Sequence, residues 1–201
     1  MRAHFLRPPE TLWEWVADGI RVIGLLSVIA AFAWWTVTDA GILALALPAL
    51  LVPRLLGSTA GFDVVYGVTV LVAAWSNVID LYRSVAWWDI LVHVVATGLI
   101  AAALHLAFQR FRIAPGPDAP RRATVVLVTI IGLAISAVWE MIEWLGKTFL
   151  APDIFVTYQD TIGDMAVGGL GSLLVGILLT RITIGRAATP AADRKESTWQ
   201  T

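Results

Sequence analysis

Six apolar stretches, separated by short polar stretches, run along the chain. Their approximate bounds are 20–38, 41–56, 62–79, 89–108, 123–150 and 162–184. A helix needs about 20 mainly apolar residues to cross a bilayer core, and five of the stretches are close to that length. The second stretch is short and contains Pro48 and Pro53, which predicts a kinked helix or a re-entrant half-helix. The pattern predicts an all-α fold, a polytopic transmembrane bundle of about six helices.

The composition supports a single domain embedded in a membrane. Of the 201 residues, 58% are hydrophobic and 14% are charged, whereas a soluble domain is about half apolar and a quarter charged. We expect one integral membrane domain over 1–201, with solvated tails at 1–18 and 186–201. The first apolar stretch begins late and is followed by others, which predicts a retained span and not a cleaved signal peptide. A net charge of −1 argues against nucleic-acid binding.

Basic residues predict the orientation. Arg110, Arg112, Arg121 and Arg122 lie between the fourth and fifth stretches, whereas Arg83 is the only basic residue between the third and fourth. Lys and Arg accumulate on the cytoplasmic side, so both termini are predicted to be cytoplasmic. A re-entrant second stretch would move only the N-terminus and first helix to the other side. Most of the ten Trp residues fall near the opposite, extracytoplasmic ends, as expected for an interfacial belt.

Three pairs of ionisable residues interrupt the apolar stretches near one end. They are Asp89 and His93, Glu140 and Glu143, and Asp160 and Asp164. Members of each pair are three or four residues apart and therefore share a helix face, with Thr97 and Ser136 one turn further along two of these faces. In the predicted topology all three pairs lie within about two turns of the outer interface. Helices joined by short loops are usually neighbours, so we expect the pairs to converge.

The charge balance of these pairs predicts a bound cation or shared protons. Five carboxylates surround one imidazole, and the nearest cations are Arg83 and Lys147. Two carboxylates about 6 Å apart repel by roughly 3 kcal/mol at an effective dielectric constant of 20. Either some carboxyls stay protonated or a cation lies among them. Carboxylates with an imidazole suit a divalent ion such as Mg, Mn, Ca or Zn.

The metal hypothesis assigns a role to each residue. The predicted metal ligands are His93, Glu140, Glu143 and Asp164, and the predicted catalytic residues, beside the ion or acting as general base, are Asp89 and Asp160. Simpler interpretations exist: Asp89 and Asp160 also suit helix N-caps, and a single buried His is often a hydrogen-bonded core residue. Glu140 and Glu143 fit such interpretations least, since they lie inside an apolar run. Asp80 either joins the site or faces water, and His105 lies too deep to join it.

The last apolar stretch carries small residues at a spacing of four, at Gly168, Ser172 and Gly176. Small residues at this spacing allow helix backbones to pack closely in lipid. We expect this packing to bring Asp164 near the two glutamates.

The three motifs resemble those of a known family. They read WWDILVHVVATG, AISAVWEMIEW and QDTIGDM, and in this order they are similar to the YjdF-like family of bacterial inner-membrane proteins, whose function is unknown. The resemblance implies the six ionisable residues above as the family's polar positions and places the chain in a bacterial plasma membrane. The chain departs from the family at Ile90, where Arg is frequent, and at Tyr158–Gln159, where Gly–Asp is frequent. The layout also loosely resembles VanZ-like proteins of the cell envelope.

Three functions are compatible with the sequence, which leaves open whether the protein is an enzyme. The first is a cation-binding site that opens to the extracytoplasmic leaflet and acts on a lipid or cell-envelope precursor, with membrane lipids and a lipid-linked substrate as partners. The second is a small transporter or proton-coupled carrier that uses Glu140 and Glu143. The third is a structural or assembly factor. Polar residues are sparse beyond Thr97, Thr129 and Ser136, apart from His105, which favours a one-sided site over a transport pathway.

Overall fold

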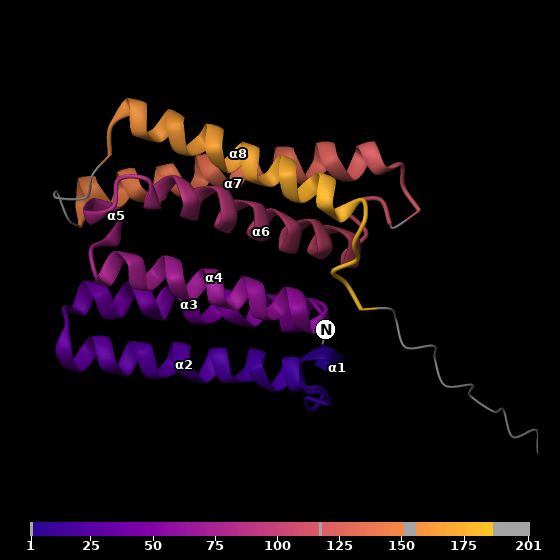
Figure 1. Cartoon of the computed structure of the whole chain (residues 1–201), viewed down its shortest axis with the longest axis horizontal. Coiled ribbons are helices and arrows are strands. Elements are labelled where there is room, and N and C mark those ends of the chain that lie inside the picture. Colours follow the sequence, from indigo (N-terminus) through magenta and orange to yellow (C-terminus); the bar gives the residue numbers. More distant parts are fainter. Residues whose placement is uncertain (1, 117, 151–155, 187–201) are drawn as a thin grey trace, which may run out of the picture.

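The computed structural model describes residues 2–116, 118–150 and 156–186, and these residues form an all-helical bundle (Figure 1). The helices are α1 (Arg2–Phe5), α2 (Leu12–Trp34), α3 (Val37–Leu56), α4 (Ala60–Val78), α5 (Leu81–Ser84), α6 (Trp88–Arg110), α7 (Arg121–Phe149) and α8 (Tyr158–Leu179). Six of them, all except α1 and α5, are long and apolar enough to cross a membrane. The predicted helical membrane bundle is confirmed.

The bounds of α2 and α3 differ from the expected ones. Helix α2 begins at Leu12, inside the segment expected to be a solvated tail, because Thr11 and Glu14 form a capping box at its start. Thr36 and Asp39 form the same motif at the start of α3, so this helix extends over 20 residues and is not short. The remainder of the expected C-terminal tail, 187–201, lies outside the described residues.

Helix α3 runs through both prolines and ends at Gly57. Gly57 adopts a left-handed conformation with φ of 66°, which glycine reaches without the steric cost that a side chain imposes. The ring of His4 packs directly against Gly57, 2.9 Å from where a Cβ atom would be. The turn therefore positions both the following loop and the N-terminal helix.

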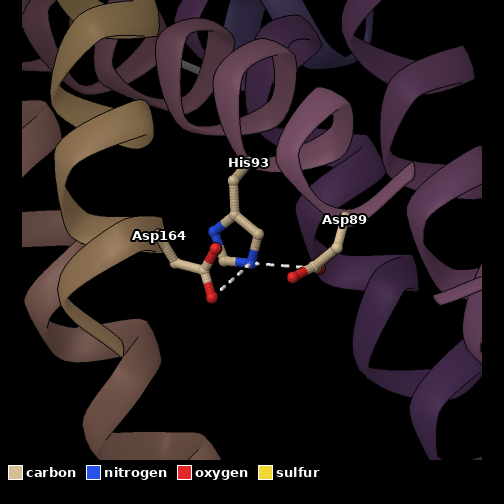
Figure 2. Close-up of side chains that lie close together, drawn as sticks. All are labelled: Asp89, His93 and Asp164. Atoms are coloured by element: carbon tan, nitrogen blue, oxygen red, sulfur yellow. Dashed lines mark ion pairs between the residues drawn. The ribbon is translucent and has the colours of Figure 1, made fainter. Parts of the chain in front are cut away.

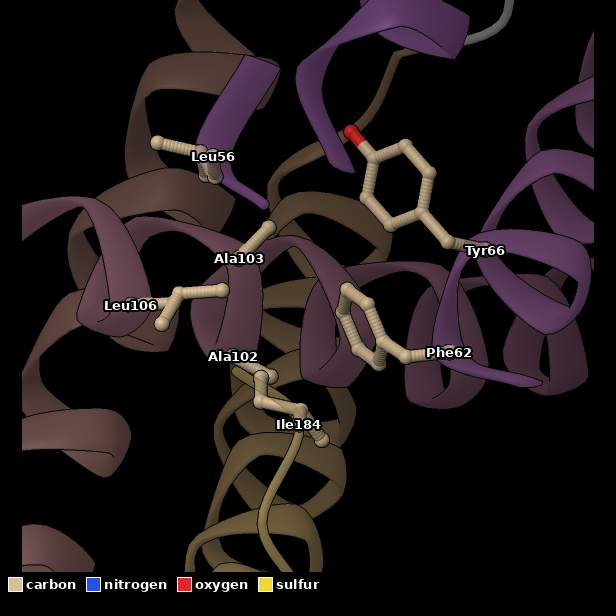
Figure 3. Close-up of a cluster of buried hydrophobic side chains, with 7 residues drawn as sticks. All are labelled: Leu56, Phe62, Tyr66, Ala102, Ala103, Leu106 and Ile184. Atoms are coloured by element: carbon tan, nitrogen blue, oxygen red, sulfur yellow. The ribbon is translucent and has the colours of Figure 1, made fainter. Parts of the chain in front are cut away.

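The long helices form two groups of three. Helices α2, α3 and α4 pack on one another, as do α6, α7 and α8, and α6 contacts α3 and α4 between the groups. A hydrophobic cluster joins the groups where Phe62 and Tyr66 of α4 face Ala102, Ala103 and Leu106 of α6 (Figure 3). Many large apolar side chains on the outer faces of the helices are exposed, and membrane-spanning helices present such faces to lipid.

Small residues allow α8 to pack closely against α6 and α7. A Cβ atom at Gly171 would lie 2.0 Å from the carbonyl oxygen of Val94 on α6, and one at Gly168 would lie 2.1 Å from Oγ of Ser136 on α7. Such distances leave no room for a side chain, so the helix backbones are in near contact. The close packing expected from the small residues of α8 is confirmed.

The two ends of the bundle differ in charge. We call the end that carries α5 and the start of α8 the acidic end, and the end that carries α1 and the loop after α3 the arginine end (Figure 1). At the arginine end, Arg7 and Arg186 both pair with Glu14, and Arg21 pairs with Asp63 at 2.6 Å. The backbone of Arg186 also donates to the Gly57 carbonyl oxygen at 2.9 Å, which fastens the segment after α8 to the α3–α4 loop.

Candidate functional site

The acidic end brings together Asp89, His93 and Asp164. Asp89 and His93 lie one turn apart on α6, and Asp164 faces them from α8 (Figure 2). Nε2 of His93 is 3.5 Å from Oδ1 of Asp89 and 3.9 Å from Oδ2 of Asp164. His93 and Asp164 are buried, whereas the Asp89 side chain keeps 32% of its surface exposed. Asp89 therefore lies on the open side of the group.

The spacing of these atoms suits a metal ion. One ligand atom from each residue lies within 4.8 Å of the other two. An ion bound at about 2.1–2.3 Å from each ligand atom holds its ligands roughly 3.0–4.6 Å apart. An ion can therefore fit between these side chains with small adjustments. The donor set, one imidazole and two carboxylates, is one that Zn and the harder divalent ions accept.

The same imidazole nitrogen faces both carboxylates. Nε2 carries at most one proton, so it donates one good hydrogen bond and cannot satisfy Asp89 and Asp164 equally. Both distances exceed the usual 2.7–3.2 Å of a direct hydrogen bond. A cation would interact with all three groups at once, since it has no single direction of donation.

Glu140 is a buried carboxylate beside this group. It lies on α7 with 5% of its surface exposed, and it interacts electrostatically with His93, Asp89 and Asp160. Thr161 lies within reach of the carboxyl group, but neither carboxylate oxygen makes a hydrogen bond of normal geometry with the described residues. A buried carboxylate without partners is costly, so Glu140 is a candidate to face a cation, a proton or water.

Glu143 and Asp160 lie at the margin of the site. Glu143 is half-buried and accepts a hydrogen bond of 2.9 Å from Nε1 of Trp139. Asp160 lies in the first turn of α8, where its backbone N–H donates to Oγ1 of Thr157 at 3.2 Å. Thr157 is the N-cap of α8 and Trp87 holds that position in α6. The interpretation of Asp89 and Asp160 as N-caps is therefore wrong.

The structure groups the predicted site residues differently from the sequence assignment. Two predicted ligands, His93 and Asp164, meet Asp89, which was assigned to catalysis. Glu140 and Glu143 are within electrostatic reach of His93 but are not part of this three-residue group. The ligand and catalytic roles of all six residues stay predictions. Asp80 is largely exposed, with 69% of its side chain accessible.

Tyr82 of α5 is a neighbour of the site that the sequence did not indicate. Its hydroxyl donates to the carbonyl oxygen of Ala73 at 3.0 Å. Burial, followed by the negative charges of Asp89 and Glu143, raises the pKa of the Tyr82 phenol, so the phenol stays neutral beside the acidic group. An aromatic residue near a helix end resembles other belt residues, and no sequence signal distinguished it.

The sequence pattern also does not predict that the charged residues of the arginine end lie together. Its residues are far apart in the chain, and several sit in the first or last turns of apolar stretches. One local signal was available, because Thr11 followed three residues later by Glu14 is a capping-box pattern. The pairing of Glu14 with Arg186, however, joins opposite ends of the sequence.

Comparisons with known proteins support the membrane assignment. A family model described as a predicted membrane protein (DUF2238) matches residues 15–184. No curated protein and no solved structure matches the chain. The YjdF-like resemblance is consistent with the family match, whereas the likeness to VanZ-like proteins is not shown. Since the match covers most of the chain and all three ionisable motifs, the chain belongs to this family of predicted membrane proteins, DUF2238.

Proposed function

We propose that the acidic end binds a divalent cation between Asp89, His93 and Asp164. The observation that carries the proposal is the position of three ligand atoms, from two helices, within 4.8 Å of one another. The excess of carboxylates supports it, because Glu140, Glu143 and Asp160 add negative charge around the same imidazole. A divalent ion would neutralise this charge and remove the need to protonate several groups.

We assign the supporting roles from burial and contacts. Neither oxygen of Glu140 has a hydrogen-bond partner in the described part of the chain, so this residue would complete the ligand set or accept a proton from a bound water. Glu143, held by Trp139, and Asp160, at the start of α8, add negative charge at the rim. In this assignment Asp89 moves from the predicted general base to the ligand set, and Glu140 takes the place of the base.

The same proposal names a lipid or cell-envelope precursor as the molecule on which the site acts. A bound ion would polarise a phosphate or ester oxygen, or activate a water for attack on it. Asp89 would give the ion an opening, and two exposed apolar residues are close to it in the sequence, Trp87 at the N-cap of α6 and Ile90 in its first turn. An open groove lined by Trp144, Lys147, Thr148 and Val156 lies at the same end. Lys147 could pair with a lipid phosphate there, and the predicted orientation would place this end at the extracytoplasmic leaflet.

The test is calorimetric titration of chelator-treated protein in detergent with Mg²⁺, Mn²⁺, Ca²⁺ and Zn²⁺. We expect one equivalent of at least one ion to bind, and His93→Gln or Asp164→Asn to weaken binding about 100-fold. Asp80→Asn is the matched control, because Asp80 lies at the same end but is largely exposed. Failure of all four ions to bind the wild type, or equal affinity in Asp164→Asn, would refute the proposed site.

A further inference from the structure

Below the acidic group, three helices carry buried residues at a spacing of four. Each set follows a spacing of four: His93, Thr97, Ala101 and His105 on α6; Glu140, Ser136, Gly132 and Val128 on α7; and Asp164, Gly168, Ser172 and Gly176 on α8. All of these residues are buried. We call this set the central column.

Contacts at the glycines fix the levels of the column. A Cβ atom at Gly168 would meet Oγ of Ser136 at 2.1 Å and Oγ1 of Thr97 at 3.1 Å. A Cβ atom at Gly132 would meet Oγ of Ser172 at 1.8 Å and Cβ of Ala101 at 3.7 Å. The first two levels below the acidic group therefore contain residues of all three helices, and each holds at least one hydroxyl. His105 is placed at the third level by its spacing of four from Ala101.

The column contains polar atoms that lack partners. Oγ of Ser136 and both ring nitrogens of His105 are buried and have no hydrogen-bond partner among the described residues. His105 keeps 4% of its surface exposed, in a helix that would gain packing and lose no hydrogen bond if this residue were apolar. Buried polar groups in proteins are nearly always satisfied, by water if not by protein. Because the glycine contacts leave no room within a level, water that satisfies these atoms would lie between the levels.

Past His105, α6 continues to the arginine end. Arg110, five residues further on α6, has a buried Nε without a partner among the residues described, and its guanidinium donates to the carbonyl oxygens of Gly57 and Arg186. These two residues line a cavity of about 20 Å³, together with His4 and Glu14. A cavity of this size holds one water molecule. Burial, followed by the charge of Arg110, lowers the pKa of His4, so this imidazole adds no charge near neutral pH.

We propose that the central column is a proton relay that joins the acidic group to the arginine end through His105. Successive levels are about 6 Å apart by helix rise, a gap that one bridging water spans with two hydrogen bonds. Thr97, Ser136 and Ser172 each carry a hydroxyl, a group that can donate one hydrogen bond and accept others. The Ser172 hydroxyl donates to the carbonyl oxygen of Gly168 at 2.9 Å, so it would have to rotate to pass a proton on. His105 takes up a proton at one ring nitrogen and releases one from the other, so each transfer leaves the imidazole unchanged apart from its tautomer.

The relay is a further activity and does not depend on the cation. The sequence predicts a one-sided site, and the relay adds a route across the bundle, because the Ser172 hydroxyl continues the polar residues past Ser136 toward His105. His105 lies three turns from His93 on α6, too far along the helix to contact the proposed ligands. Its protonation can therefore be tested separately from cation binding.

The experiment measures proton flux in vesicles of phosphatidylethanolamine and phosphatidylglycerol that contain the purified full chain. A pH-sensitive dye is trapped inside, and a potassium gradient with valinomycin supplies the driving potential. We expect wild-type vesicles to acidify faster than empty ones, and His105→Leu to lower the flux about tenfold or more. His105→Gln, which keeps a polar side chain but takes up no proton, should lose flux equally. Thr69→Val is the matched control and should keep the flux, because the Thr69 hydroxyl lies outside the column and donates to the carbonyl oxygen of Val65.

Two comparisons separate the possible outcomes. Wild-type flux equal to that of empty vesicles, or full flux in a folded His105→Gln protein, would overturn the relay and leave His105 as a structural residue. Calorimetric cation binding by the His105 variants should match wild type. Proton flux without cation binding would support the relay and refute the proposed cation site. Cation binding without proton flux would support the cation site and refute the relay.

Discussion

His93 shows how one residue organises the acidic end. Its position four residues after Asp89 places both side chains on one face of α6, and this relation is readable from the sequence. Its distance of 3.9 Å from Asp164 depends on the packing of α8, which the sequence predicts only in outline. Glu140 is buried, whereas Glu143 is held by Trp139. This difference depends on how α7 is rotated about its own axis, which a spacing of three residues does not define.

Gly171 tests the close packing that positions Asp164. Gly171→Ala would force a methyl group to within 2.0 Å of the Val94 carbonyl oxygen, so α8 must move away from α6. We expect the variant to unfold at a lower temperature in detergent, because its free energy of unfolding should fall by about 1–3 kcal/mol. Gly163→Ala in the same helix is the control, since it meets nothing within 4 Å; it should be neutral or slightly stabilising. Equal melting temperatures for the two variants would show that the backbones are not in contact.

Glu140→Gln tests the charge balance at the site. The substitution keeps the shape of the side chain and removes one buried negative charge, so we expect the chelator-treated protein to be as stable as wild type or more stable. It should also bind the cation about tenfold more weakly, equivalent to about 1.4 kcal/mol. Glu143→Gln should have a smaller effect because Trp139 already holds that carboxylate. If the carboxyl groups share protons and no ion is bound, Glu140→Gln should raise the melting temperature, and titration should detect no cation binding in either protein.

At the scale of elements, hydrophobicity predicts the existence of the helices better than their ends. Each of the six long helices overlaps one of the apolar stretches, because a span must be both long and apolar. The starts of α2 and α3 were missed because Thr11 with Glu14 and Thr36 with Asp39 are polar residues that belong to the helices. A search for capping boxes would have found both starts.

Glu14 tests how the first and last elements are joined. Its carboxylate accepts from Arg7 and Arg186 and from the backbone N–H of Glu10 at 2.6 Å. We expect Glu14→Gln to leave two arginines without their carboxylate and to destabilise the protein by about 2 kcal/mol or more, measured by denaturant unfolding in mixed micelles. Glu10→Gln is the control, because the Glu10 side chain is 65% exposed and contributes little. A Glu14→Gln protein as stable as the control would show that the segment after α8 is held by other contacts.

At the scale of the whole molecule, the bundle has one acidic end and one end rich in arginine. The predicted orientation places the arginine end in the cytoplasm. The sequence predicted the acidic end because its six ionisable residues fall at corresponding ends of three apolar stretches. It did not predict the arginine end, because pairs such as Arg186 with Glu14 and Arg21 with Asp63 exist only after the helices assemble.

Single-cysteine labelling tests this orientation, and the chain has no native Cys that would interfere. In intact cells, a membrane-impermeant reagent should label Ser84→Cys and Thr157→Cys together, since α5 and the start of α8 lie at the same end (Figure 1). Pro117→Cys and Ser197→Cys, at positions outside the described residues, should react only after the cells are opened. Labelling of Pro117→Cys in intact cells would reverse the orientation and place the acidic end in the cytoplasm.

The most direct test of the cation site is to locate the ion. Crystals of the chelator-treated protein, soaked with Mn²⁺ or Zn²⁺ and measured at the absorption edge of the metal, would show the ion as an anomalous-difference peak. We predict a peak about 2.0–2.3 Å from Nε2 of His93 and from one carboxylate oxygen each of Asp89 and Asp164. A protein that binds either ion in solution but shows no peak between these residues, or shows its peak elsewhere, would contradict the account.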